Sequence, residues 1–207
     1  MAKDTYKSTI TNLEEINKLD LEFDNLKEQF DKRIYGSVTE ERARANKLIV
    51  NKKLKRPIQE VFQLFLSEAA SSMHASLKAE DLTNGGYYRT SGKSNKLISK
   101  VSTLIPNKEI AIIWYANDQQ FIRSLKFSTN NSNTVTHIKF FNLTTGMASV
   151  AGYLERHIKN VYAKRQKISF QVQMMKIEME LGIIPQEKHE ATNKKIERFL
   201  KFAEELY

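Results

Sequence analysis

The stretch TLIPNKEIAIIWYANDQQFIRSLKFS, residues 103–128, decides how the middle of this chain folds. Its segment EIAIIWYA, residues 109–116, is apolar at every position after the glutamate, whereas a half-exposed strand alternates apolar and polar residues. Successive strand residues point to opposite faces, so we expect other parts of the chain to cover both faces of this strand. One face carries Ile110, Ile112 and Trp114, and the other carries Ala111, Ile113 and Tyr115.

The next segment, QFIRSLKFS at residues 120–128, places an arginine among the apolar residues of one strand face. Phe121, Arg123, Leu125 and Phe127 share that face because they alternate along the strand. A buried guanidinium needs a partner. Two interpretations remain open. Arg123 binds the carboxylate or phosphate of a ligand, or it extends to the rim of the core or pairs with an acidic residue such as Glu155.

Short turns separate these two segments from further strand-like segments on either side. The four segments are residues 96–105, 109–116, 120–128 and 134–143, and the sequences PNK, ND and TNNSN between them are typical of turns. Parallel neighbours would need crossovers of about a dozen residues or more. The segments are therefore predicted to form an antiparallel meander.

Helical patterns flank the meander. Residues 10–34 have the apolar spacing of a packed helix, and residues 46–54 alternate as a strand. Pro57 suits the first turn of an amphipathic helix that runs to about residue 77 or breaks near Ser71 and Ser72. Residues 82–92 contain a turn and a short strand. Helices before and after a meander predict a layered α+β fold.

A long helix is predicted from residue 147 to residue 180, with an apolar stripe facing the sheet and basic residues on its opposite side. At about 1.5 Å per residue it would be about 50 Å long, so it should overhang the sheet or bend. Gly182 ends this helix and Pro185 opens a last one. The stripe consists of Val150, Leu154, Ile158, Val161, Ile168, Val172, Met175 and Met179.

Composition limits the function classes. The 207 residues contain no Cys, which excludes disulfides and thiolate chemistry, and the net charge is +9. We expect a helical N-terminal extension over residues 1–45, a central domain over 46–182 and a helical extension over 183–207. The central domain holds 20 basic and 9 acidic residues, net +11. No apolar run spans a bilayer and no secretory signal is evident, so we expect a cytoplasmic protein.

Three stretches resemble the START-like superfamily, also called helix-grip or SRPBCC proteins, and in particular an uncharacterised bacterial branch of unknown function. They are VNKKLKRPIQEVFQLF, LIPNKEIAIIWYANDQQFIRSLKFS and NTVTHIKFFN, and the resemblance covers residues 46 to about 180. It implies a curved antiparallel sheet wrapped on a long C-terminal helix. It also implies a hydrophobic cavity between the two, which relatives use for lipids, sterols, polyketides or hormones.

The residues that would line such a cavity come from the short strand, the meander and the long helix. A binding protein for an apolar or amphipathic small molecule, without catalysis and without a cofactor, is the function this resemblance favours. Fold alone does not settle function, and some relatives are enzymes or cochaperones. The candidates are Tyr88, Trp114, Phe121, Arg123, Leu125, Ile138, Phe140, Leu154, His157, Ile158 and Val161.

Three alternatives remain open. The terminal helices could make the protein an oligomeric interaction module, because a seam of apolar residues could hold a second copy. The basic central domain could bind nucleic acid or an anionic membrane surface, or its charge could simply be a solvated surface. No histidine has a neighbour at metal-ligand spacing, and no catalytic or nucleotide-binding motif is evident. The seam consists of Ile16, Leu19, Phe23, Leu26 and Phe30.

Overall fold

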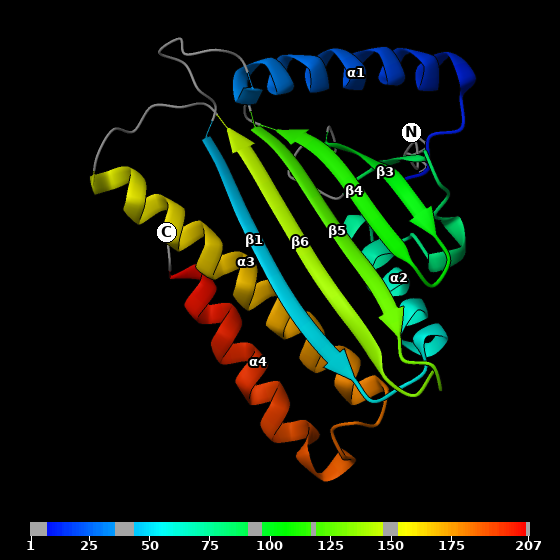
Figure 1. The fold of residues 1–207 in the computed structure, drawn as a ribbon, viewed down its shortest axis with the longest axis vertical. Coiled ribbons are helices and arrows are strands. Elements are labelled where there is room, and N and C mark those ends of the chain that lie inside the picture. The colour runs from blue at the N-terminus through cyan, green and yellow to red at the C-terminus, as the bar shows by residue number, and fades with distance from the viewer. Residues whose placement is uncertain (1–7, 36–43, 91–96, 117–118, 147–152, 206–207) are drawn as a thin grey trace, which may run out of the picture.

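The protein folds as a six-stranded antiparallel sheet combined with four α-helices (Figure 1). The computed structural model describes residues 8–35, 44–90, 97–116, 119–146 and 153–205, with the side chains of residues 33–35, 44–45, 146, 153–160 and 162 left out. The predicted α+β class is confirmed. In the sequence, Thr39, Glu40 and Glu41 could cap a short second helix, but these residues lie outside the described part of the chain.

The sheet has the strand order β1-β6-β5-β4-β3-β2. The predicted meander is confirmed, since β3, β4 and β5 each pair antiparallel with the next strand along the chain. Asn107 and Asn133 occupy the left-handed backbone region in two of its turns, at φ 58° and 52°. The strands are β1 (Arg44–Leu54), β2 (Tyr87–Arg89), β3 (Ile98–Ile105), β4 (Glu109–Ala116), β5 (Gln119–Thr129) and β6 (Thr136–Gly146).

The helices largely follow the sequence patterns. The amphipathic helix after Pro57 ends at Met73, earlier than predicted, because His74 adopts an extended backbone. Gly182 ends the long helix in the left-handed region, at φ 64°, as predicted. The start predicted at residue 147 lies outside the described residues. The helices are α1 (Leu13–Tyr35), α2 (Ile58–Met73), α3 (Tyr153–Glu180) and α4 (His189–Glu204), with 3-10 turns η1 (Ala79–Asp81) and η2 (Gln186–Lys188).

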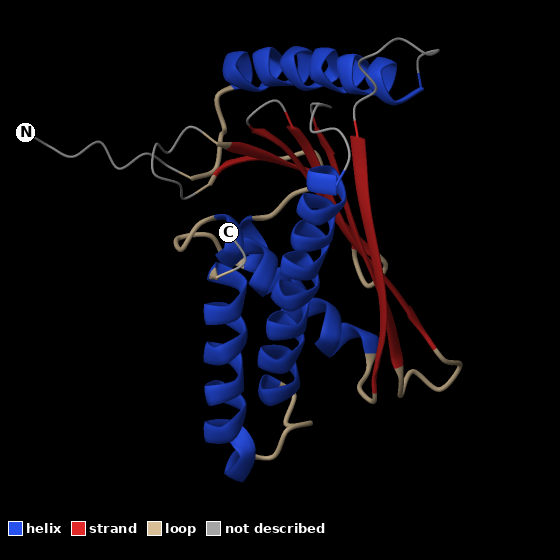
Figure 2. Cartoon of the chain, turned by 90° about the vertical axis from the view of Figure 1, so that its left-hand side faces the viewer, coloured by secondary structure: helices blue, strands red, loops and turns tan. Residues whose placement is uncertain are grey.

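Helices α2 and α3 cover one face of the sheet and form the main core with it (Figure 2). We call this the inner face. It includes Ile110 and Ile112 of β4, as the alternation of that strand predicts. Asn133 in the β5–β6 turn accepts a hydrogen bond at 3.1 Å from the backbone N–H of Ile58 and so supports the start of α2. The turn and the helix thereby fix each other although they are far apart in sequence.

The orientation of α3 differs from the prediction. Its stripe residues Ile168 and Val172 face α4 and not the sheet, together with Ile196 of α4. The sheet instead receives Phe170, Met174 and Ile177, which are almost fully buried. The C-terminal half of α3 is apolar on two sides, and α4 needs a partner for its own apolar stripe. Packing therefore decided which side of α3 met the sheet.

Helix α1 packs on the opposite, outer face of the sheet, at one end (Figure 1). The ring of Phe23 meets Tyr87 and Tyr115 edge-on, with centroids 5.2 Å and 5.1 Å apart. Helix α1 therefore covers the part of the outer face around Tyr87 and Tyr115. Leu19, Phe23 and Phe30 are buried there, so the seam considered for a second copy is occupied by the chain's own sheet.

Polar contacts also hold α1 on the sheet. Asp20 accepts hydrogen bonds from the Tyr87 hydroxyl and the Lys100 ammonium, each at 2.6 Å, and Arg89 pairs with Glu15 at 2.6 Å. The hydrogen bond from Lys100, followed by that from Tyr87, holds the pKa of Asp20 below its ordinary value. Burial, with Asp20 as its hydrogen-bond partner, raises the pKa of Tyr87.

Substituting Asp20→Asn should destabilise the protein slightly and in a pH-dependent way. Asparagine keeps an acceptor for Tyr87 but removes the charge that Lys100 meets. Because Asp20 is about half exposed, we expect a loss of at most about 1 kcal/mol. Because the pKa of Asp20 is lowered in the folded protein, its contacts stabilise the fold above about pH 4. This stabilisation disappears as pH falls through the folded-state pKa of Asp20. Urea denaturation at several pH values, with Glu22→Gln as control, checks this result; a difference that grows in acid would contradict it.

Candidate ligand-binding site

Strands β4 and β5 bring two aromatic rings and a guanidinium together on the inner face. Trp114 and Phe121 are directly opposite each other in the two strands. Their rings stack with centroids 5.1 Å apart and planes 3° from parallel. The guanidinium of Arg123, two residues beyond Phe121, lies 5.7 Å from the centroid of the Trp114 ring. The planar guanidinium of Arg123 and the indole ring of Trp114 therefore lie next to each other on the inner face of the sheet.

Two amide side chains surround the guanidinium. Asn142 of β6 is opposite Arg123 in the sheet, and Gln166 comes from α3. Arg123 Nη2 donates to Gln166 Oε1 at 3.3 Å, and Asn142 Nδ2 lies 3.5 Å from the same oxygen. Asn142 is only 1% exposed, and its Oδ1 has no hydrogen-bond partner among the described residues. An acceptor buried without a donor costs free energy unless a bound molecule supplies one.

A cavity of about 220 Å³ opens beside this cluster. Ile112, Trp114 and Met73 supply apolar surface, while Thr90 and Ser99 add hydroxyl groups that are themselves mostly buried. Thr90 and Leu97 border residues 91–96, which lie outside the described part. The full lining is Ser72, Met73, Thr90, Leu97, Ser99, Ile112, Trp114 and Arg123.

Away from this cavity, the core between the sheet and the helices contains aliphatic side chains and a cluster of phenylalanine rings. Phe170 of α3 stacks on Phe140 of β6 with centroids 4.4 Å apart, and Phe65 of α2 lies 6.5 Å from Phe170. Phe127 of β5 meets Phe62 and Phe65 edge-on. A long apolar tail would have to displace these rings, whereas the cavity at Trp114 requires no such displacement.

The predicted cavity residues separate into three groups. Trp114, Phe121 and Arg123 come together at the site, and Leu125, Ile138 and Phe140 lie in the packed core. Val161 is half-buried on α3, and the side chains of Leu154, His157 and Ile158 lie outside the described part, as does that of Glu155. Tyr88 is fully buried, and its hydroxyl donates to Asp81 O and accepts from Thr83 N.

Sequence reasoning missed Asn142 and Gln166. A signal for Asn142 was present, because Ile138, Phe140 and Asn142 alternate along β6 and an amide there breaks the apolar pattern of the inner face. Gln166 had no such signal, since polar residues occupy most neighbouring positions of α3. Only the pairing of β5 with β6 and the placement of α3 bring both amides to Arg123.

The described residues contain no group of His, Asp or Glu that could hold a metal ion. No described helix is long and apolar enough to cross a membrane. The polar side chains that line the cavity are the Arg123 guanidinium and the hydroxyls of Ser72, Thr90 and Ser99, all of which can form hydrogen bonds.

Comparisons with known proteins show a shared fold. No protein-family model matches the chain, and no curated protein matches it. The structure of the protein of unknown function SA2116 from Staphylococcus aureus is similar, with a TM-score of 0.50 and 14% identity over 65% of this chain and 92% of that chain. At this identity the likeness extends to the fold alone.

Two further solved structures are more distant. CalU16 from Micromonospora echinospora has a TM-score of 0.47 and 11% identity over 80% of this chain and 99% of its own. The Aha1 dimer from Colwellia psychrerythraea has a TM-score of 0.36 and 14% identity over 56% of this chain and 87% of its own. These structures, like SA2116, come from bacteria.

Proposed function

We propose that this protein binds a small amphipathic molecule between the inner face of the sheet and α2 and α3, without changing it chemically. The ligand has a carboxylate or another acceptor group and a flat apolar body. We further propose that the sheet and α3 form a START-like, helix-grip arrangement. The antiparallel sheet with the long helix α3 on its inner face supports this assignment.

One observation carries the proposal: Arg123 lies over the Trp114 ring beside Asn142, whose buried Oδ1 lacks a partner among the described residues. A carboxylic ligand would accept from the guanidinium through its two oxygens. Asn142 lies outside the lining of the cavity, so only a ligand that extends past Arg123 and carries a donor would satisfy its Oδ1. Stacking on the indole would hold the apolar body. A flat molecule with a polar group at one end can make all three of these interactions.

The cavity volume limits the size of the ligand. An apolar cavity of roughly 150 Å³ accommodates benzene, and drug-sized molecules occupy about 300–1,000 Å³. The cavity of about 220 Å³ therefore suits one ring with a short substituent. Sterols and long fatty acids are too large for it while the phenylalanine cluster remains packed.

Tryptophan fluorescence tests the proposal directly, because Trp114 is the single Trp of the chain. Titration with arene carboxylates, their uncharged amides and short-chain fatty acids should give a saturable change with at least one aromatic acid. Substituting Arg123→Met should weaken binding of the acid by roughly tenfold to a hundredfold and affect the amide far less. Methionine of similar length keeps the core filled.

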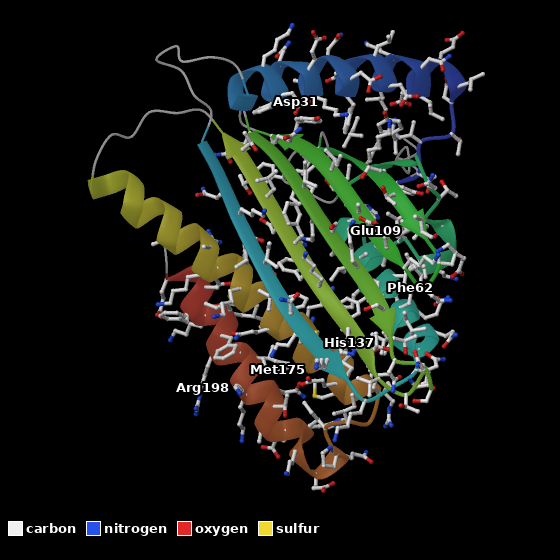
Figure 3. All side chains as sticks on the ribbon, in the orientation of Figure 1. Asp31, Phe62, Glu109, His137, Met175 and Arg198 are labelled. Carbon is white, nitrogen blue, oxygen red and sulfur yellow. The ribbon has the colours of Figure 1, made fainter. Side chains whose placement is uncertain are left out.

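Arg198→Met is the matched control. Arg198 is exposed on α4, and Figure 3 shows it pointing away from the sheet. This variant should bind the acid like the wild type. If no member of the panel changes the fluorescence, or if the two substitutions weaken binding equally, the proposed site is wrong. A native mass spectrum of gently purified protein, with an adduct lost on denaturation, would identify a co-purified ligand.

A further inference from the structure

A second hollow, of about 610 Å³, lies at the other end of the sheet, where β1, β5 and β6 meet. Basic side chains of the outer face surround it: Lys53 of β1, Lys126 of β5, and His137 and Lys139 of β6. The labels of Glu109 and His137 in Figure 3 mark this end of the sheet. Helix α1 packs at the opposite end, against Tyr87 and Tyr115, and leaves this hollow open.

The strand register places basic side chains side by side in this hollow. Lys126 and Lys139 are directly opposite each other across β5 and β6, and Lys53 is opposite His137 across β1 and β6. Lys126 also pairs with Glu109 at 3.3 Å. Among the described residues Lys53 and Lys139 have no acidic partner within salt-bridge distance. Like charges directly opposite in a sheet are destabilising, so the arrangement favours binding of an anion over stability.

An aromatic and apolar strip continues from the lysines along the same face. Phe141 is the next outward residue of β6 after Lys139, about 7 Å along the strand. Its ring is half-buried, and Lys47 lies 5.7 Å from its centroid. Ile49, opposite Phe141 in β1, is 43% exposed. Positive charge and an accessible aromatic ring therefore alternate along one line of the sheet.

We propose that this outer face binds single-stranded nucleic acid, with the phosphates on Lys53, Lys126 and Lys139 and a base against Phe141. Proteins that bind single strands without sequence preference combine basic side chains along the nucleic-acid backbone with aromatic rings on which bases stack. The excess charge of the central domain adds long-range attraction. A flat bilayer would contact the rim of this hollow before it reached the lysines inside. The shape therefore favours a single strand over a membrane surface. This site is independent of the cavity at Trp114, which lies on the inner face.

The test uses fluorescence anisotropy of a labelled oligothymidylate with the full-length protein at low salt. Three phosphate contacts should make the logarithm of affinity fall with the logarithm of salt with a slope of about −2. The double variant Lys53→Glu, Lys139→Glu should weaken binding at least tenfold and flatten this slope. The control Lys27→Glu, Lys188→Glu makes the same charge change at exposed positions of α1 and η2 and should lose far less affinity.

A milder variant separates binding from folding. Lys139→Gln should lower affinity several-fold without lowering the urea midpoint, because it removes one of two facing like charges. The absence of oligothymidylate binding at low salt would overturn the proposal, and so would equal losses in both double variants. Binding to vesicles of phosphatidylserine and phosphatidylcholine, with no binding of the oligonucleotide, would replace nucleic acid by a membrane surface.

Discussion

Replacing Phe170 by alanine should lower the free energy of unfolding by about 3–5 kcal/mol. Phe170 is 2% exposed and its ring contacts Phe140 of β6 and Phe65 of α2, so it joins three elements in one aromatic cluster. Removing the ring leaves a cavity that the rigid sheet can close only in part. Urea denaturation followed by circular dichroism measures the loss, which should appear as a lower midpoint with an unchanged slope.

Phe202→Ala is the matched control for this result. It makes the same chemical change on α4, where Phe202 is 39% exposed and lies against Lys164 of α3. We expect a loss of less than about 1 kcal/mol, because little apolar area returns to water. Equal losses in the two variants would show that α3 does not dock on the sheet through Phe170. A loss of ligand response in Phe170→Ala alone would not show this, because an unfolded protein also lacks the binding site.

Replacing Phe23 by alanine should cost about 3 kcal/mol and loosen α1 from the outer face. Phe23 is 7% exposed and meets both Tyr87 and Tyr115 edge-on, an arrangement that adds to the free energy of area burial. Once α1 is loosened, Tyr87 and Ile98 become exposed to solvent. Limited proteolysis should then cleave within residues 13–35 faster than in the wild type, while the unfolding midpoint falls.

Leu21→Ala tests whether this effect belongs to the docked side of α1. Leu21 is on the same helix, two residues away, and is 69% exposed. Its substitution should change stability by about 0.5 kcal/mol or less, because alanine also has the higher helix propensity. If Leu21→Ala destabilises as much as Phe23→Ala, the helix packs by another side, and a second copy of the chain becomes the simplest explanation of its apolar seam.

Much of the fold was predictable because its signals are local. The short turns at PNK and TNNSN allow only antiparallel neighbours, and the structure has left-handed Asn107 and Asn133 in those turns. The segment EIAIIWYA is apolar on both faces, which required a cover on each side. The inner core covers one face, and α1 covers the Tyr115 end of the other. Backbone geometry makes such inferences reliable, since the period of a strand depends on no distant contact.

The site was predictable only in part. Alternation places Phe121 and Arg123 on one face of β5, but the register between β4 and β5 is what puts Trp114 on that same face. Asn142 and Gln166 come from β6 and α3, and no local pattern states how far α3 lies from β5 or which of its sides is turned inward. Whether the cavity is open was likewise a matter of ring packing, which residue types alone do not determine.

The sequence by itself determined the α+β class, the meander, the basic central domain and the amphipathic helices that must cover the sheet. Tertiary structure alone decided that Phe170, Met174 and Ile177 of α3 meet the sheet while Ile168 and Val172 meet α4. It also decided that the heptad-spaced seam of α1 is used within the chain. The reason is physical: periodicity shows that an apolar face must be buried, but the choice of partner depends on which packing leaves the least apolar area in water.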